Sequence, residues 1–521
     1  MRSLLILHKD ENQDLFKNHM FKGFNILKMN KTTDIPEKER ALVLQGGGSL
    51  GAYGAGVYRG FHESLSKMDA REGKKGKPIF DIIAGTSIGA INAAVLVSYV
   101  VENQTYEGSV ERLVDFWNYL SRESITETNP FFKTWWDYWH TINGNIASGE
   151  AARRYYSAME FAIYGVPNVF YPHGPTYDDK FFDVNNIWYR FSNEPLKRSL
   201  ERFAKFPIAT TKEKDQPRLL LVAVDVAEGS PVTFDSYPKE DGSRKTEYGR
   251  FISHDGNEVG FEHIVRYDKG ITSDHVIASG SFPVNFDFAS IEVESYNSVH
   301  GGAISPKNSN IKNGNSYGYS KEMRYFWDGG LLANTPLMQL VLQHRHYWYK
   351  IRGLIHNVPR LGICVINLHP KKQAEIPADR DGVINRNNDI SFSDKVDQEE
   401  AMLLLTSDYI DLVGTLMKIA TDHGVSKDII NNLLDQKTRF HGAFLKPGRF
   451  LDIVEGRFQI DEIIQVNRKN DEHTISNKIF DFSAETIQLL LNQGYDDALV
   501  AANKYLESKG KQLIDINEMK K

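Results

Sequence analysis

The 521-residue sequence predicts an α/β fold with a largely parallel sheet. Two strand–loop–helix units follow each other directly between residues 41 and 101. In each unit, a short apolar run typical of a buried strand leads into a glycine-containing turn and then into a segment with helical apolar spacing. With 41% hydrophobic residues, the chain can bury a large core, and it is too long for a single core of ordinary size.

The predicted elements can be justified in chain order. In the first unit, "ALVLQ" is the strand, "GGGSLGAYGAG" the loop and "VYRGFHESLSKM" the helix; in the second, these are "IFDIIA", "GTSIG" and "AINAAVLVSYVV". Further along, "PRLLLVAVDVAEGSPVTF" predicts two strands around a turn, and "SDHVIASGSFPVNF" a short helix that ends at Pro283. We also expect helices over 337–351, 394–423 and 483–508, and a strand in "LGICVINLHP".

Composition divides the chain into three parts. Residues 1–38 are rich in Lys, Asn and Asp, and we expect a mobile leader and linker there. Residues 39–375 form the expected α/β domain, interrupted at about 111–192 by an insert rich in aromatic residues and proline. Residues 376–521 are expected to form a mainly helical C-terminal extension.

Charge and cysteine content exclude several classes of protein. A net charge of −6 leaves no overall electrostatic footprint for nucleic acid. The single cysteine, Cys364, excludes an intrachain disulfide, and its apolar surroundings predict a packed side chain. The apolar run near the N-terminus is too short for a signal peptide, and no apolar run approaches a membrane span. We therefore expect a cytoplasmic protein with peripheral membrane contact at most.

The glycine loop after the first strand allows two uses. Gly46, Gly48 and Gly51 match G-x-G-x-x-G, a dinucleotide-binding pattern that requires an acidic residue at the end of the next strand. That strand ends in "GTSIG" instead, and Asp69 lies in a predicted loop. The second use is an oxyanion hole, in which backbone N–H groups face the oxygen that becomes negative during attack on an ester.

"GTSIG" fits the G-x-S-x-G pattern, in which a serine sits on a sharp turn between strand and helix. A Cβ at Gly85 or Gly89 would collide with the closely packed backbone, whereas Ser87 would project outward. The alternative is an ordinary turn of small residues. Because loops after neighbouring parallel strands open at the same sheet edge, we expect Ser87 to meet Gly47 and Gly48.

A serine nucleophile needs a base. None of the 16 histidines stands out, and we interpret four of them as surface or capping residues: His275, His300, His344 and His346. Asp328 is a different candidate, because Gly329 and Gly330 after it leave room around the carboxylate. The alternative for "DGG" is a plain turn.

Taken together, "GGGSLGAYGAG", "GTSIGAINA", "ASGSFPVNF" and "DGGLLANTP" resemble the patatin-like phospholipase family over roughly residues 41–370. The resemblance implies a three-layer α/β/α sandwich and a carboxylic ester hydrolase of lipid metabolism. It implies Ser87 as the nucleophile, Asp328 as the only base, an oxyanion hole at Gly47 and Gly48, and no metal or cofactor. Many members carry a basic residue where this chain has Leu50, a difference that weakens anion attraction or marks a bacterial-type subgroup.

The aromatic insert also has two interpretations. Trp135, Trp136 and Trp139 belong either to a helix packed on the core or to a lid or acyl-chain wall near the site. The expected partner is a lipid or another acyl ester, and the sequence does not predict an oligomeric state. Two alternatives stay open: an esterase for soluble hydroxyalkanoate-like oligomers or thioesters, and a non-catalytic module that binds a nucleotide or lipid.

Overall fold

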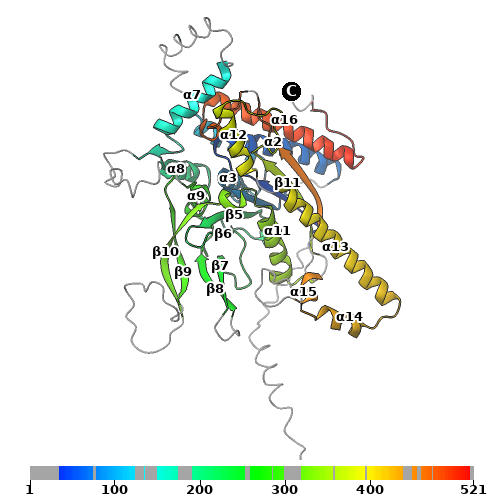
Figure 1. Ribbon diagram of the computed structural model, residues 1–521. Coiled ribbons are helices and arrows are strands. Elements are labelled where there is room, and N and C mark those ends of the chain that lie inside the picture. Colours follow the sequence, from blue (N-terminus) through cyan, green and yellow to red (C-terminus); the bar gives the residue numbers. More distant parts are fainter. Residues whose placement is uncertain are drawn as a thin grey trace, which may run out of the picture. The chain divides into compact units, whose positions relative to one another are not determined.

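The structure is a computed structural model that describes residues 35–73, 78–123, 134, 149–173, 191–252, 259–283, 285–297, 318–355, 358–393, 396–437, 449–454, 459–471 and 473–516 (Figure 1). The chain divides into two compact units, Met1–Pro36 and Glu37–Lys521, and only the last two residues of the first unit are described. Most of the expected leader and the three tryptophans of the insert, Trp135, Trp136 and Trp139, lie outside the described residues.

The second unit contains one large sheet, in the order β12-β11-β1-β2-β5-β10-β9-β8-β7, with β6 paired to β5; β3 and β4 form a separate pair. The strands are β1 Lys38–Leu44, β2 Ile82–Thr86, β3 Tyr171–Pro172, β4 Phe191–Ser192, β5 Arg218–Asp225, β6 Ser230–Asp235, β7 Lys245–Ile252, β8 Val259–Arg266, β9 Ala289–Asn297, β10 Gly318–Asp328, β11 Arg360–Asn367 and β12 Ile460–Asn467.

The helices flank this sheet. They are α2 Gly51–Arg71, α3 Ile88–Asn103, α4 Ser109–Leu120, α7 Gly149–Tyr164, α8 Glu194–Phe203, α9 Ser273–Gly280, α10 Gly330–Ala333, α11 Leu337–Arg345, α12 Arg380–Phe392, α13 Val396–Asp422, α14 Lys427–Leu434, α15 Phe450–Val454 and α16 Ala484–Ser508. Short helical turns of other types are η1 Gly48–Leu50, η3 Lys212–Lys214, η4 His346–Ile351 and η5 Lys478–Phe480.

The prediction of an α/β fold with a mostly parallel central sheet is confirmed. Strands β12, β11, β1, β2 and β5 are all parallel, with β1 pairing Leu42 to Cys364 on one side and to Ile83 on the other. Strands β10, β9, β8 and β7 continue the sheet in antiparallel fashion, which the sequence did not predict. Cys364 is buried in β11, as expected.

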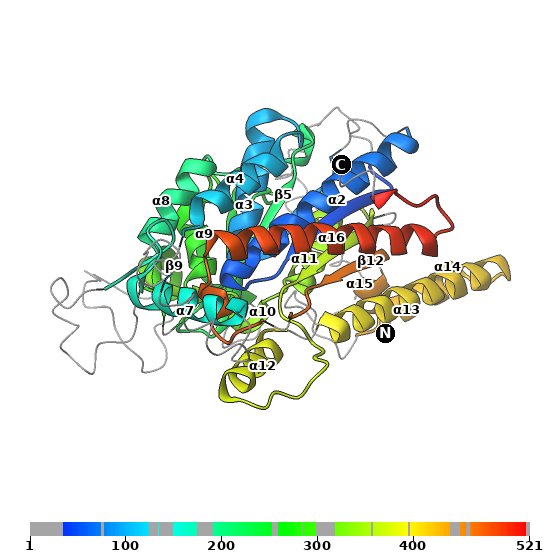
Figure 2. The ribbon, with the colours of Figure 1, turned by 90° about the horizontal axis from the view of Figure 1, so that it is seen from above.

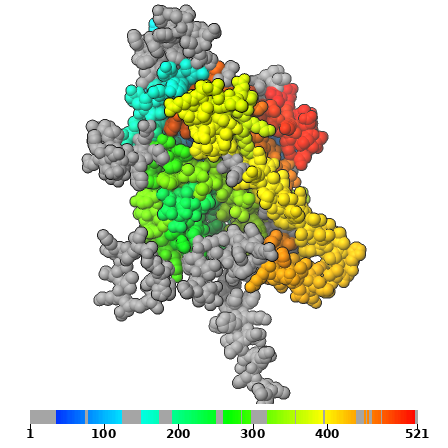
Figure 3. Space-filling view, viewed as in Figure 1, coloured from blue at the N-terminus to red at the C-terminus, as the bar shows by residue number. Residues whose placement is uncertain are grey.

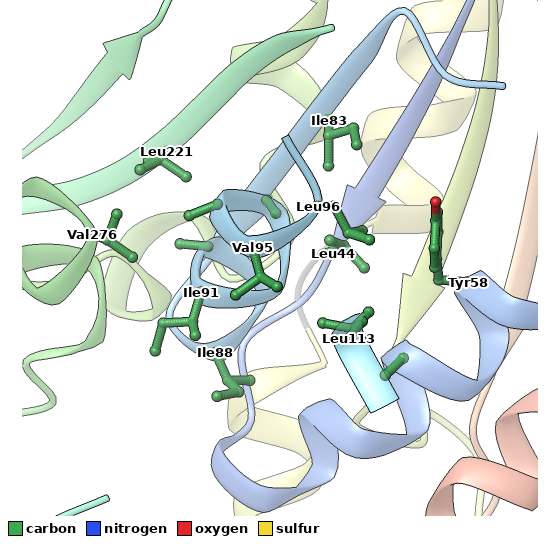
Figure 4. Packing of buried hydrophobic residues seen from close by; sticks show 14 of the residues in the cluster. Leu44, Tyr58, Ile83, Ile88, Ile91, Val95, Leu96, Leu113, Leu221 and Val276 are labelled. Atoms are coloured by element: carbon green, nitrogen blue, oxygen red, sulfur yellow. The ribbon is translucent and has the colours of Figure 1, made fainter. Parts of the chain in front are cut away.

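Two apolar clusters, one on each face of the sheet, make a three-layer arrangement. On one face, Leu44, Ile83 and Leu221 pack against α3 and its neighbouring helices (Figure 4). This face also buries residues of α2, α4, α9 and α16. On the other face, alternate residues of the same strands, such as Val43 and Ala84, pack against α11 and α13. Helix α3 is buried because almost every side chain in its first twelve positions is small or apolar.

Besides the packing of α13, a strand and a long helix join the C-terminal part of the chain to this core. Strand β12 pairs with β11 along the edge of the sheet, and α16 lies alongside α2 (Figure 2). Glycines allow the two helices to approach closely: a Cβ at Gly56 would lie 2.0 Å from the Leu491 carbonyl oxygen, and one at Gly494 would lie 2.1 Å from that of Tyr53. The C-terminal segment therefore contributes a helix to the face of the sheet that also carries α2 and α3, the helices that follow the two predicted glycine motifs.

Candidate active site

Ser87 occupies the single residue between β2 and α3. Its backbone has φ 57° and ψ −127°, an uncommon conformation for a residue with a side chain. A Cβ at Gly85 would lie 2.3 Å from the Gly89 carbonyl oxygen, and one at Gly89 would lie 2.2 Å from that of Leu44. The turn therefore requires glycine at both ends and holds Ser87 in a strained backbone conformation.

Side chains from two other segments hold this turn in place. The Ser87 amide donates a hydrogen bond to Ser279 Oγ at 2.9 Å, and the Ser279 hydroxyl donates to the Val222 carbonyl at 2.5 Å. The Thr86 hydroxyl donates to the Ala333 carbonyl at 2.8 Å. Ser279 belongs to the motif "ASGSFPVNF", so one contribution of this motif is to tie the Ser87 turn to β5.

Asp328 is the last residue of β10 and is almost completely buried. Its amide donates to the Ser281 carbonyl at 2.9 Å, and its Oδ1 accepts from the Gly330 amide at 2.7 Å. Burial raises the pKa of the Asp328 carboxyl to about 7, although hydrogen bonds with the Ser87 side chain and the Gly330 amide act in the opposite direction. The structure thus places a carboxyl of near-neutral pKa beside Ser87.

The glycine loop reaches Ser87 from the neighbouring strand β1. A Cβ at Gly46 would lie 2.8 Å from Ser87 Cβ. The Gly46 amide donates to both Asn334 oxygens, Oδ1 at 3.1 Å and the carbonyl at 3.2 Å. In the described part of the chain, the Gly47 and Gly48 amides have no hydrogen-bond acceptor. These two N–H groups at the start of a helical segment are therefore available to a ligand.

Leu50 and Gly51 of the same loop turn toward the core. Leu50 is buried in the cluster that contains α3, and a Cβ at Gly51 would lie 2.5 Å from the Ile88 side chain. The apolar residue at position 50 therefore has a packing role in this chain. Asp69, expected in a loop, instead lies near the end of α2, where Arg40 binds it through both carboxylate oxygens.

A single pocket contains the parts of the site described so far, and its empty volume, counted together with the open solvent at its mouth, is about 820 Å³. Ser87, Asp328 and the glycine loop all line it. The remaining lining is mainly apolar and includes six phenylalanines, Phe170, Phe282, Phe286, Phe392, Phe480 and Phe482. Phe392, Phe480 and Phe482 belong to the C-terminal segment, whose contribution to the site the sequence did not predict.

His369 also lines the pocket, and it was not among the histidines that the sequence singled out. A Cβ at Gly47 would lie 3.2 Å from His369 Nε2. Burial lowers the pKa of the imidazole, although the hydrogen bond with Asp389 acts in the opposite direction. A signal was present in the sequence: "LGICVINLHP" places His369 just after a strand parallel to the one that carries the glycine loop.

Behind His369 lies a buried polar cluster centred on Asp389 of α12. Its Oδ1 accepts from Lys478 Nζ at 2.6 Å and lies 3.3 Å from His369 Nδ1, and its Oδ2 accepts from Asn470 at 2.6 Å. Burial raises the pKa of Asp389, but these partners outweigh that effect and lower it to about 2. The cluster supports the glycine loop directly, because the Ser49 hydroxyl donates to the Lys478 carbonyl at 2.6 Å.

The other histidines lie away from this pocket. His275 caps α9 through Thr272, as expected. The expectation of a surface or capping role for His344 is wrong: it is fully buried, with Nε2 3.2 Å from Glu39 Oε2. His346 is partly buried, and His300 lies outside the described residues.

Within the described ranges, one group of side chains has the spacing of metal ligands: Glu228, Glu262 and His263. None of the three lines the pocket, and Glu228 already accepts from Arg324 at 3.1 Å. As for membrane insertion, none of the helices that the structure describes combines the length and apolar character needed to cross a bilayer.

Comparison with known proteins places the chain in a family. Among solved structures, VipD from Legionella pneumophila matches with 11% sequence identity and a TM-score of 0.26, over 90% of this chain and 67% of that chain. No curated protein matches the sequence. The patatin-like phospholipase family matches residues 42–341, more than half of the chain, and the chain therefore belongs to that family.

Proposed function

We propose that this protein is a serine–aspartate acyl-ester hydrolase that acts on lipid-like substrates. The observation that carries the proposal is the convergence of three groups in one apolar pocket: Ser87 on its strained turn, the buried Asp328 carboxyl that hydrogen-bonds it, and the free Gly47 and Gly48 amides. Family membership supports the same class of reaction, because it implies lipid acyl hydrolase activity.

In the proposed mechanism, the Asp328 carboxylate takes the proton of the Ser87 hydroxyl as its oxygen attacks the ester carbonyl. The Gly47 and Gly48 amides hold the resulting oxyanion. The alcohol leaves with a proton from Asp328, and an acyl ester on Ser87 remains. Water, deprotonated by the same carboxylate, then releases the acid. Each half-reaction begins with ionised Asp328. Because the pKa of this carboxyl is about 7, activity should rise with pH as the pH passes through neutrality.

The lining of the pocket supports an acyl chain as the part of the substrate that is bound. Phenylalanine rings bury large apolar areas and give no hydrogen-bond partner to a polar chain. Polar lining side chains, such as Asn193 and Asn334, are few by comparison. A long acyl chain would gain about 0.8 kcal/mol for each methylene buried there.

Hydrolysis of p-nitrophenyl butyrate tests the reaction. We expect Ser87→Ala and Asp328→Asn each to lower kcat/KM at least about 100-fold. Ser66→Ala, on the exposed side of α2, is the matched control and keeps full activity. Circular dichroism establishes that all variants are folded. A folded Ser87→Ala or Asp328→Asn variant with wild-type activity would overturn the proposal.

The substrate class needs a separate measurement. We expect the purified protein to release fatty acids from a mixed phospholipid and glycerolipid extract, measured by mass spectrometry, and the Ser87→Ala variant to release none. Cleavage of hydroxyalkanoate oligomers with no fatty-acid release would retain the serine mechanism but replace the lipid substrate by the soluble alternative.

A further inference from the structure

Helix α13 (Val396–Asp422) carries apolar residues on two sides. On one side, Val396 and Leu403 pack into the cluster formed with α11 and the sheet, and Ile410 is also buried. A second row of large apolar side chains is exposed, with exposed fractions from 46% for Leu405 to 61% for Tyr409. We call this row the α13 seam; it consists of Met402, Leu405, Tyr409, Leu412, Leu416 and Ile419.

The spacing of the α13 seam is that of a coiled coil. Successive members are 3, 4, 3, 4 and 3 residues apart, the alternation of the a and d positions of a heptad. From Met402 to Ile419 the row extends about 25 Å along the helix at 1.5 Å per residue. A period of 3.5 residues keeps a row of side chains facing another helix, whereas packing on a flat surface does not require it.

The exposed apolar surface extends beyond the seam. Val413 of α13 is also exposed, as are Ile429 and Leu433 of α14. Figure 1 shows that α13 extends from the sheet toward α14, and Figure 3 shows α13 at the molecular surface in yellow. Together, the seam side chains and these three present on the order of 800 Å² of exposed surface. One partner contributes about this area to a stable interface, and the usual apolar patch on a monomer is smaller.

We propose that the α13 seam is the interface between two copies of this chain, with the two α13 helices antiparallel about a twofold axis. When the twofold axis passes midway between Tyr409 and Leu412, the seam of one copy pairs with the seam of the other. Met402 then packs against the partner's Ile419, Leu405 against the partner's Leu416, and Tyr409 against the partner's Leu412. Each layer pairs an a position with a d position, as antiparallel helices require, and no seam residue is left unmatched.

The charges beside the seam are compatible with this pairing. In the antiparallel register, Asp408 lies opposite the partner's Thr415, and Asp422 lies opposite the partner's Ala401, so no like charges face each other. Along the exposed part of α13, Asp408, Asp411 and Asp422 outnumber the one basic residue, Lys418. This acidic border disfavours an anionic lipid surface as the occupant. The inference does not depend on the proposed hydrolysis.

Light scattering coupled to size-exclusion chromatography of the full chain tests the interface. We expect the wild type at micromolar concentration to have twice the mass of one chain, and Leu412→Glu to have the mass of one. Lys418→Glu changes charge on the same helix but outside the seam, so this control stays a dimer. Both side chains are exposed in the single chain. Both variants should therefore remain folded with unchanged secondary structure, whether they are monomers or dimers.

Disulfide trapping tests the antiparallel arrangement, and the buried Cys364 does not interfere. The double variant Met402→Cys/Ile419→Cys should form a disulfide-linked dimer under mild oxidation, whereas Met402→Cys alone should not, because the two copies of position 402 lie at opposite ends of the seam. A dimer linked through Met402→Cys alone would overturn the antiparallel arrangement.

Two other results would overturn the interface itself. One is a Leu412→Glu variant that remains dimeric. The other is a monomeric wild type, in which something else covers the seam. Flotation of the wild type with vesicles of phosphatidylcholine and phosphatidylglycerol, if Leu412→Glu abolishes it, would identify that occupant as lipid. If the wild type does not float, a segment of the same chain would be the remaining occupant.

Discussion

At the scale of single residues, the environment of Asp328 serves reactivity at a cost in stability. The carboxyl is almost fully buried and has no cationic partner among the groups that shift its pKa, so burial dominates and raises that pKa from 3.8 to about 7. A carboxylate with a pKa near the working pH is a stronger base than an exposed one. The same burial means that ionising Asp328 in the folded protein costs free energy.

The sign of this cost can be tested. The folded state holds the Asp328 proton up to about pH 7, whereas the unfolded state releases it near pH 3.8, so stability falls as pH rises between these values. Above pH 7 the loss is on the order of 4 kcal/mol, from 1.36 kcal/mol per pKa unit. We therefore expect Asp328→Asn to raise the free energy of unfolding at pH 8 and to have little effect at pH 4. Urea unfolding at both values measures this, and an Asp328→Asn variant less stable than wild type at pH 8 would contradict the assigned environment.

At the scale of elements, the contact between α2 and α16 connects the C-terminal segment to the glycine loop. Gly56 of α2 lies directly against the backbone of α16, because a Cβ there would be 2.0 Å from the Leu491 carbonyl oxygen. Gly54 lies two residues earlier on the same helix, and a Cβ there would meet nothing closer than 3.6 Å. Neither position has a positive φ, so the two glycines differ mainly in the space beside them.

This difference predicts opposite effects of one substitution. Gly56→Ala should lower the free energy of unfolding by about 2 kcal/mol, because the helices must separate to admit the methyl group. Gly54→Ala should be neutral or stabilising by up to about 1 kcal/mol, because alanine is the better helix former. Denaturant unfolding of the two variants measures both effects. Equal effects would mean that α2 and α16 do not pack as closely as described.

At the scale of the whole molecule, the pocket is built from distant parts of the chain, and Asp389 joins several of them. Replacing it by Asn removes the carboxylate to which the buried Lys478 side chain donates, so we expect a loss of about 3 kcal/mol in unfolding free energy. The control is Asp435→Asn, whose pair with Arg449 is exposed, and this change should cost at most about 0.5 kcal/mol. Thermal unfolding compares the two. A similar, small effect for both would show that the Asp389 cluster contributes little to the fold.

The sequence predicted those parts of the fold and site that short motifs encode. The first two strand–loop–helix units and the parallel core were predicted, and the turn at Ser87 lies between the expected strand and helix. The antiparallel strands β7 to β10 were not, because alternating polar and apolar residues are a weak signal when the partner strand is unknown. Phe480, Phe482 and the Asp389 cluster reach the pocket only through contacts with residues hundreds of positions away, and local spacing contains no information about such contacts.

The central claim is that Asp328 alone activates Ser87, and the rate of fluorophosphonate labelling as a function of pH tests it most directly. Mass spectrometry should locate the label on Ser87, with a rate that rises about tenfold per pH unit below pH 7 and levels off above it. In Asp328→Asn the labelling should be at least about 100-fold slower and should lose this dependence. Labelling of Asp328→Asn at the wild-type rate, or equal labelling of Ser87→Ala, would contradict the account.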